Sequence, residues 1–149
     1  MSERRAVVTG ASRGIGEHTA RRLARDGWAL LLVARREDRL QALAGELGGD
    51  VHWLAADLTD EDAPARVRAK VNELWGGLDL LVNNAGSSWH TTFADGGYES
   101  VRQTMDLNFY AVVRLSEKFP GEKIATVDRE HFTLLRRFRR ERLPLLLPK

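Results

Sequence analysis

The sequence predicts an α/β fold in which a parallel β-sheet is doubly wound, with helices on both faces. From residue 5 to about residue 82, apolar runs of strand length alternate with segments of helical period. The strand-like runs are apolar almost throughout, which is typical of parallel strands covered on both faces. A glycine-rich turn at residues 9–16 follows the first run and opens a helical pattern. Right-handed crossovers would then gather the loops at the carboxyl ends of the strands around one crevice.

The candidate elements follow one another in a regular order. Strands are predicted at residues 6–9, 28–33, 51–55 and 78–82. Three amphipathic helices lie between them, and their repeating positions are Ile15, Thr19, Ala20, Leu23 and Ala24, then Leu40, Leu43, Ala44 and Leu47, then Val67, Val71, Leu74 and Trp75. Thr59 followed by Asp62 resembles a capping box for the third helix, although Pro64 allows a start one turn later. Residues 123–127 form a candidate fifth strand that would cover the edge of the fourth, so we expect the sheet to be truncated after its fourth or fifth strand.

Composition places the chain among ordinary globular proteins. It has 149 residues, of which 43% are hydrophobic and 30% charged, and this argues against disordered and membrane classes. The longest apolar run, residues 28–34, is too short to span a bilayer, and the N-terminus leads into a strand rather than a signal peptide. The absence of cysteine excludes disulfides and thiolate metal sites. A cytoplasmic location is therefore the expectation.

Charge divides the chain into two parts. Residues 1–128 carry 16 Lys and Arg against 19 Asp and Glu, whereas residues 129–149 carry 7 against 2. We therefore expect an incomplete nucleotide-binding domain over residues 1–128 and a basic tail over residues 129–149. The basicity belongs to the tail, so it does not predict a nucleic-acid surface on the main domain.

The glycine-rich turn has the pattern of a phosphate-binding site. Gly10, Gly14 and Gly16 let the backbone turn sharply and approach a pyrophosphate, while the first N–H groups of the next helix face the anion. The pattern alone also fits a tight connection between a strand and a helix that binds nothing. The motifs that follow it along the chain decide between the two interpretations.

Five motifs in one order make residues 4–118 resemble the N-terminal part of a short-chain dehydrogenase/reductase. They are Thr-Gly-Ala-Ser-Arg-Gly-Ile-Gly at residues 9–16, Ala34-Arg35, Asp57-Leu58, Asn83-Asn84-Ala85-Gly86 and Asp106-Leu107-Asn108. The resemblance implies a Rossmann-type sheet, a nicotinamide cofactor, and hydride transfer to or from a small carbonyl or alcohol substrate. It also implies cofactor-binding roles for Gly10, Ser12, Arg13, Gly14, Ile15, Gly16, Arg35, Asp57, Leu58, Asn83, Ala85 and Gly86.

Arginines in this pattern favour NADP over NAD. NAD-preferring sites usually present a carboxylate at the end of the second strand, because it accepts hydrogen bonds from the ribose hydroxyls and repels a 2′-phosphate. This chain has Arg35 and Arg36 there instead. The resemblance implies that Arg13 also contacts the 2′-phosphate, which a guanidinium matches in shape and charge. The alternative is that Arg35 and Arg36 are solvated charges at a helix start.

Two polar residues at strand ends have structural as well as binding interpretations. Asp57 could cap the turn that follows it. The resemblance implies that it also accepts a hydrogen bond from the adenine amino group, with help from the Leu58 backbone. Asn83 begins a run of small residues that would let the cofactor lie against the backbone, and the resemblance implies that it ties neighbouring strands together.

Asn108 is the candidate catalytic residue. Val101, Met105, Val112, Leu115 and Phe119 form one helical stripe, and Asn108 lies on the same face, so its amide is expected to point inward. The residues alone favour a buried asparagine satisfied by neighbouring backbone. The resemblance implies instead the asparagine of the family's catalytic tetrad, which holds a water in a proton relay.

The rest of that tetrad has no counterpart in the sequence. The family uses a serine after the fifth strand and a Tyr-x-x-x-Lys pair, in which lysine lowers the pKa of the proton-transferring tyrosine. The two tyrosines, Tyr98 and Tyr110, are each followed four residues later by arginine. Asp128 stands roughly where the serine would be and does not replace its hydroxyl. The prediction is therefore an NADP-dependent reductase by resemblance that is inactive as this chain.

Two alternatives from other functional classes stay open at this point. One is a non-enzymatic NADP-binding module, and the other is an interaction protein acting through a basic helix over residues 130–142, with Phe132, Leu135 and Phe138 on one side. The favoured interpretation of the tail is an uncommitted end left by truncation, rearrangement or a change of reading frame. No metal is expected, because the four histidines, His18, His52, His90 and His131, lack ligand spacing. No nucleic-acid or membrane partner is expected either. Substrate and oligomeric state stay open.

Overall fold

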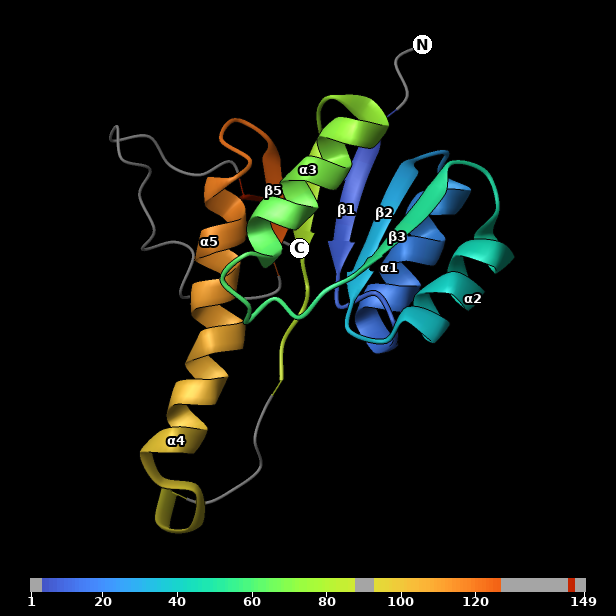
Figure 1. The fold of residues 1–149 in the computed structure, drawn as a ribbon. Helices are drawn as coiled ribbons and strands as arrows, with labels where there is room; N and C mark the ends of the chain where they lie inside the picture. The colour runs from blue at the N-terminus through green and yellow to red at the C-terminus, as the bar shows by residue number, and fades with distance from the viewer. Residues whose placement is uncertain (1–3, 88–92, 127–144, 147–149) are drawn as a thin grey trace.

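The computed structural model describes residues 4–87, 93–126 and 145–146, and it contains one parallel sheet. The strand order is β3-β2-β1-β4-β5-β6, so the chain winds outward from β1 in both directions (Figure 1). The strands are β1 (Arg5–Thr9), β2 (Ala29–Ala34), β3 (Val51–Ala55), β4 (Leu80–Asn83), β5 (Lys123–Thr126) and β6 (Leu145–Leu146). The predicted doubly wound α/β fold is confirmed, and the central strands are buried as expected.

Helices cover both faces of this sheet and create two hydrophobic cores. On one face, α1 (Gly14–Arg25) and α2 (Glu37–Leu47) pack over β1 and β2, with Leu30, Leu32 and Leu40 fully buried. On the other face lie α3 (Ala63–Trp75) and α5 (Ala111–Glu117), which pack around Leu31 and Leu81. The alternation of strand residues between the two cores explains why the strands are apolar throughout.

A long helical segment precedes β5 and has an irregular middle. It consists of α4 (Phe93–Met105), a π-helical turn η1 (Asp106–Tyr110) and α5, and α4 extends away from the sheet (Figure 1). Within it, Val112, Leu115 and Phe119 are buried, but Val101 and Met105 are 47% and 38% exposed. The predicted single stripe over residues 101–119 is therefore wrong, because the π-helical turn changes the number of residues per turn and rotates the two ends relative to each other.

The predicted strands lie within two residues of the observed ones, and the fifth strand pairs with β4 as expected. Leu145–Leu146, in the predicted tail, adds a two-residue strand that pairs with Ile124 and Ala125. No strand was predicted there. The remaining tail features, including Asp128 and the basic helix over residues 130–142, lie outside the described residues, as do His90 and His131.

For the third helix, the later of the two predicted starts is confirmed, and for the first helix one predicted position is wrong. The third helix begins at Ala63, one turn later than the capping box suggested, and Asp62 makes no side-chain capping bond. Pro64 in the first turn accounts for this later start. In α1 the buried positions are Gly16 and Ala20, whereas Ile15, expected on the apolar face, is 66% exposed.

In the described part of the chain, no helix has the length and apolar character needed to cross a membrane.

Candidate nucleotide-binding site

A cleft of about 730 Å³ lies at the carboxyl ends of the central strands. The turns after β1, β2, β3 and β4 form its walls, which is where ligands bind in open parallel sheets. Of the predicted cofactor residues, the cleft is lined by Gly10, Ser12, Arg13, Gly14, Ile15, Arg35, Asp57, Leu58, Ala85 and Gly86. Gly16 and Asn83 do not line it. The structure thus brings together residues that lie up to 76 positions apart.

The glycine-rich turn has no room for a side chain at Gly10 or Gly16. Gly10 and Gly14 have φ values of 65° and 58°, in the left-handed region that favours glycine. A Cβ atom on Gly10 would come within 2.9 Å of Ala85 Cα. A Cβ atom on Gly16 would overlap the Gly10 carbonyl oxygen and lie 2.5 Å from Asn84 Nδ2. Gly16 therefore lets α1 pack closely beneath the turn rather than lining the cleft itself.

Thr9 and Asn84 join this turn to the end of β4. Thr9 Oγ1 accepts hydrogen bonds from the Asn84 and Ala85 N–H groups, both at 3.0 Å, and donates to the Val82 carbonyl at 3.2 Å. Asn84 Nδ2 donates to the carbonyls of Thr9 and Gly10 at 3.2 and 3.4 Å. Neither role was predicted from the sequence, although Thr9 opens the glycine motif and Asn84 lies inside the Asn-Asn-Ala-Gly motif.

Asn83 has a different partner from the one expected. Its buried amide donates to Ser116 Oγ at 3.1 Å and so fastens β4 to α5. The side-chain tie from β4 to the neighbouring strand is instead made by Asn84. The expectation that Asn83 makes this tie is wrong, since successive residues of a strand point to opposite faces.

Positive charge gathers at one end of the cleft. Arg13, Arg35 and Arg36 line it and are exposed, and Arg36 Nη2 donates to the Ser12 carbonyl at 3.4 Å. Asp57 is the one acidic residue among the lining residues. This arrangement suits an anionic ligand whose charge is concentrated beyond the end of β2.

Asp57 caps the turn after β3, as one of its two interpretations predicted. Its Oδ1 accepts hydrogen bonds from the Thr59 N–H at 3.0 Å and from Thr59 Oγ1 at 2.8 Å. Partial burial acts to raise the pKa of Asp57, but the two Thr59 hydrogen bonds and the nearby Arg35 charge outweigh it and hold the pKa below its usual value. The carboxylate therefore stays ionised beside the cleft at neutral pH.

Asn108 lies in the π-helical turn and is held by one backbone residue. Its Oδ1 accepts from the Ser87 N–H at 2.9 Å, and its Nδ2 donates to the Ser87 carbonyl at 2.8 Å. A Cβ atom on Gly86 would lie 3.2 Å from Asn108 Oδ1, so this loop packs closely against the helix. The amide is satisfied by backbone, as the residues alone suggested, but Asn108 is half-buried rather than buried. The proton-relay role stays a prediction.

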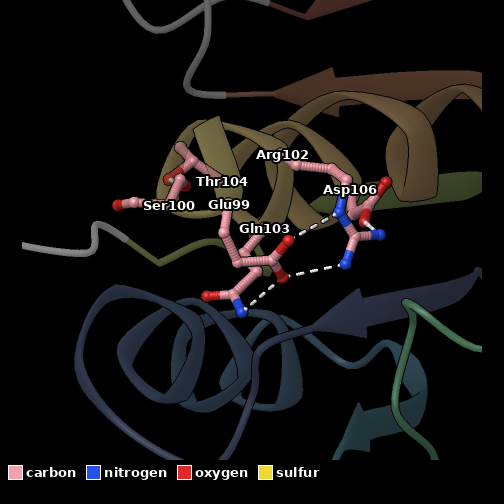
Figure 2. A network of polar contacts seen from close by, with 6 residues as sticks. All are labelled: Glu99, Ser100, Arg102, Gln103, Thr104 and Asp106. Atoms are coloured by element: carbon pink, nitrogen blue, oxygen red, sulfur yellow. Dashed lines mark hydrogen bonds and ion pairs between the residues drawn. The ribbon is translucent and has the colours of Figure 1, made fainter. Parts of the chain in front are cut away.

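A network of polar side chains on α4 and η1 lies outside the residues that line the cleft. Glu99 accepts hydrogen bonds from Arg102 and Gln103, and Arg102 also contacts Asp106 at 3.4 Å (Figure 2). The Arg102 and Gln103 hydrogen bonds lower the pKa of Glu99. All these residues belong to α4 and η1, so the network supports that helix locally. No group of three or more potential metal ligands occurs among the residues that the structure describes.

The sheet and its cleft define a class of protein. A parallel sheet with the order 3-2-1-4-5-6, a glycine-rich turn opening the first helix, and a cleft across the strand ends are the features of a Rossmann-type dinucleotide-binding protein. Within that class, the family model for short chain dehydrogenases matches residues 4–122. The chain belongs to the short-chain dehydrogenase family.

Curated relatives and solved structures agree with this assignment. Serine 3-dehydrogenase from Agrobacterium fabrum is 46% identical over 80 residues, covering 54% of this chain and 32% of the relative. The uncharacterized oxidoreductase YvrD from Bacillus subtilis is 34% identical over 127 residues, covering 84% of this chain and 48% of the relative. The chain thus spans between a third and a half of these relatives' length.

Several similar solved structures carry a nicotinamide nucleotide. An alcohol dehydrogenase from Thermococcus sibiricus, complexed with 5-hydroxy-NADP, superposes with a TM-score of 0.81 and 33% identity, covering 90% of this chain and 61% of that chain. L-Sorbose reductase from Gluconobacter frateurii, complexed with NADPH and L-sorbose, has a TM-score of 0.77 and 33% identity. The match covers 85% of this chain and 52% of that chain.

Proposed function

We propose that the cleft binds NADP(H) and that this chain is the cofactor-binding part of an oxidoreductase. The reaction of that oxidoreductase would be hydride transfer between nicotinamide and a small carbonyl or alcohol substrate. The observation that carries the cofactor preference is the pair Arg13 and Arg35 in the cleft lining, with no carboxylate directly after β2. The 2′-phosphate of NADP would find hydrogen-bond donors and positive charge there. NAD lacks this phosphate and would leave these arginines without an anion.

The described residues fit such a cofactor. Glycine at positions 10 and 16 leaves the close backbone approach that a pyrophosphate requires, and added side chains would collide there. Asp57 would accept a hydrogen bond from the adenine amino group, and Ala85 and Gly86 offer small residues where a ribose would lie. The relatives that hold NADP or NADPH support the same assignment. When bound, the nicotinamide supplies the hydride, and the protein orients it.

Proton delivery is the step for which the sequence lacks the family's Tyr-x-x-x-Lys pair. Neither Tyr98 nor Tyr110 is followed by lysine four residues later, and both are exposed on the helical segment rather than lining the cleft. Without a tyrosine of lowered pKa, a substrate oxygen would receive no proton during hydride transfer. We therefore propose that the 149-residue chain binds cofactor with turnover near zero, as a non-enzymatic module would.

Titration of the purified chain with NADPH and NADH tests the proposal. The expected result is binding of NADPH about tenfold tighter than NADH, measured by calorimetry or nucleotide fluorescence. Arg35→Ala should abolish most of the difference. Arg39→Ala, which removes the same charge from an exposed position of α2 that does not line the cleft, should keep it. Comparable affinities for the two nucleotides would contradict the preference, and NADPH-dependent reduction of a carbonyl panel would contradict the missing proton step.

A further inference from the structure

Side chains from three elements hold the carbonyl groups of the glycine-rich turn. Asn84, after β4, donates to the carbonyls of Thr9 and Gly10. His18, in α1, lies with Nδ1 2.8 Å from the Gly14 carbonyl oxygen, and this nitrogen must carry the proton because a carbonyl only accepts. Arg36, after β2, donates from Nη2 to the Ser12 carbonyl. Each of these carbonyls therefore has a side-chain donor.

This arrangement suits a turn that binds an anion. A phosphate needs N–H groups, and the first N–H groups of α1 have no partner within the helix. A carbonyl oxygen that rotated into the cleft would repel the phosphate. Donors that fix the carbonyls keep the N–H groups available, which is the preorganisation that tight binding requires.

Arg35 and Arg36 contact different parts of the cleft. The charge of Arg35 acts on Asp57, at the end of β3, where the adenosine would lie. The side chain of Arg36 instead donates to the carbonyl of Ser12, in the turn that follows the neighbouring strand β1. A backbone hydrogen bond from the Ala11 N–H to the carbonyl of Val33, near the end of β2, at 3.4 Å also joins the glycine-rich turn to this part of the chain.

We propose that Arg36 is a positioning residue that holds the glycine-rich turn in its phosphate-binding conformation, while Arg35 recognises the 2′-phosphate. This inference rests on the proposed nucleotide site and assigns separate roles within it. A direct phosphate contact by Arg36 would affect only ligands that carry a 2′-phosphate. A positioning role affects every ligand with a pyrophosphate.

Binding of ADP, NADH and NADPH to three variants separates these roles. Arg36→Ala should weaken all three ligands by a similar factor of about five, so that the ratio of NADPH to NADH affinity stays at the wild-type value. Arg35→Ala removes the same charge from the adjacent residue and should weaken NADPH alone. Arg36→Lys keeps a donor and a charge and should restore most of the affinity for all three.

Amide hydrogen exchange of residues 11–15 in the ligand-free chain gives a readout that does not depend on ligand charge. Arg36→Ala should accelerate exchange in this turn with an unchanged melting temperature, and Arg35→Ala should leave exchange unchanged. Loss of NADPH affinity alone in Arg36→Ala, or unchanged affinity and exchange, overturns the inference. If the wild type binds ADP and NADH without preferring NADPH, the cofactor proposal fails, and the ADP and exchange results still decide the role of Arg36.

Discussion

The region around the cleft and helix α4 differ in how their polar groups are paired. Around the cleft, hydrogen bonds join different elements, as Thr9 and Asn84 join β1 to β4 across about 75 positions. On α4, Glu99, Arg102 and Gln103 bond within three or four residues of one another (Figure 2). Bonds between elements fix the geometry of a site, whereas bonds within one helix support only that helix.

The two regions also differ in how far their large hydrophobic residues are buried. Five large hydrophobic residues are exposed in the described part of the chain, and four of them, Tyr98, Val101, Met105 and Tyr110, belong to α4 and η1. The fifth, Ile15, lines the cleft. The cleft region is thus closely packed except where a ligand would lie, and α4 makes less use of its apolar residues for packing.

The largest expected effect comes from filling the space beneath the glycine-rich turn. Gly16→Ala places a methyl group against the Gly10 carbonyl and Asn84, so the turn or α1 must shift. We expect the free energy of unfolding to fall by about 3 kcal/mol and ADP binding to be lost.

Gly45→Ala is the matched control, because nothing lies within 4 Å of its added Cβ atom in α2. It should keep ADP binding and stabilise the protein by up to about 1 kcal/mol. Urea unfolding and calorimetry measure both quantities. Wild-type ADP affinity in Gly16→Ala would show that the close packing seen here is not required.

Replacing one side chain by alanine on each side of the π-helical turn tests whether apolar residues are packed differently in α4 and α5. Leu115 is fully buried between α5 and the sheet, so Leu115→Ala should cost about 3 kcal/mol. Val101 lies exposed on α4, so Val101→Ala should cost less than about 0.5 kcal/mol. The measurement is urea unfolding at neutral pH. A similar cost at both sites would mean that Val101 is covered in solution.

The smallest expected effect is the pH dependence contributed by Asp57. Its folded pKa is lowered, so its contribution to stability is present above its unfolded pKa of about 3.9 and is lost as the pH falls through the folded pKa. Asp57→Asn should therefore lower stability at pH 7 and flatten the stability profile below about pH 4.

Thr59→Val, which removes only the hydroxyl donor, should give an intermediate profile. Unfolding free energies measured from pH 7 to pH 2 provide the test. If Asp57→Asn keeps the wild-type slope, the turn-capping hydrogen bonds do not stabilise the ionised carboxylate in solution.

The first five strands, the position of the cleft and most of its lining could be predicted from the residues alone. These depend on local patterns: apolar runs of strand length, helical spacing between them, and glycines at fixed intervals in one turn. The carboxyl ends of parallel strands meet at one edge, so residues after separate strands, such as Arg35 and Asp57, could be placed together before the structure was known.

The side chains that hold this edge of the sheet in place became evident only from the folded chain. It showed that Asn84 rather than Asn83 ties β4 to β1, that Arg36 bonds Ser12, and that the π-helical turn leaves Val101 exposed. The physical reason is that a hydrogen bond between distant elements depends on the direction of each side chain after folding. Spacing along the chain does not specify that direction.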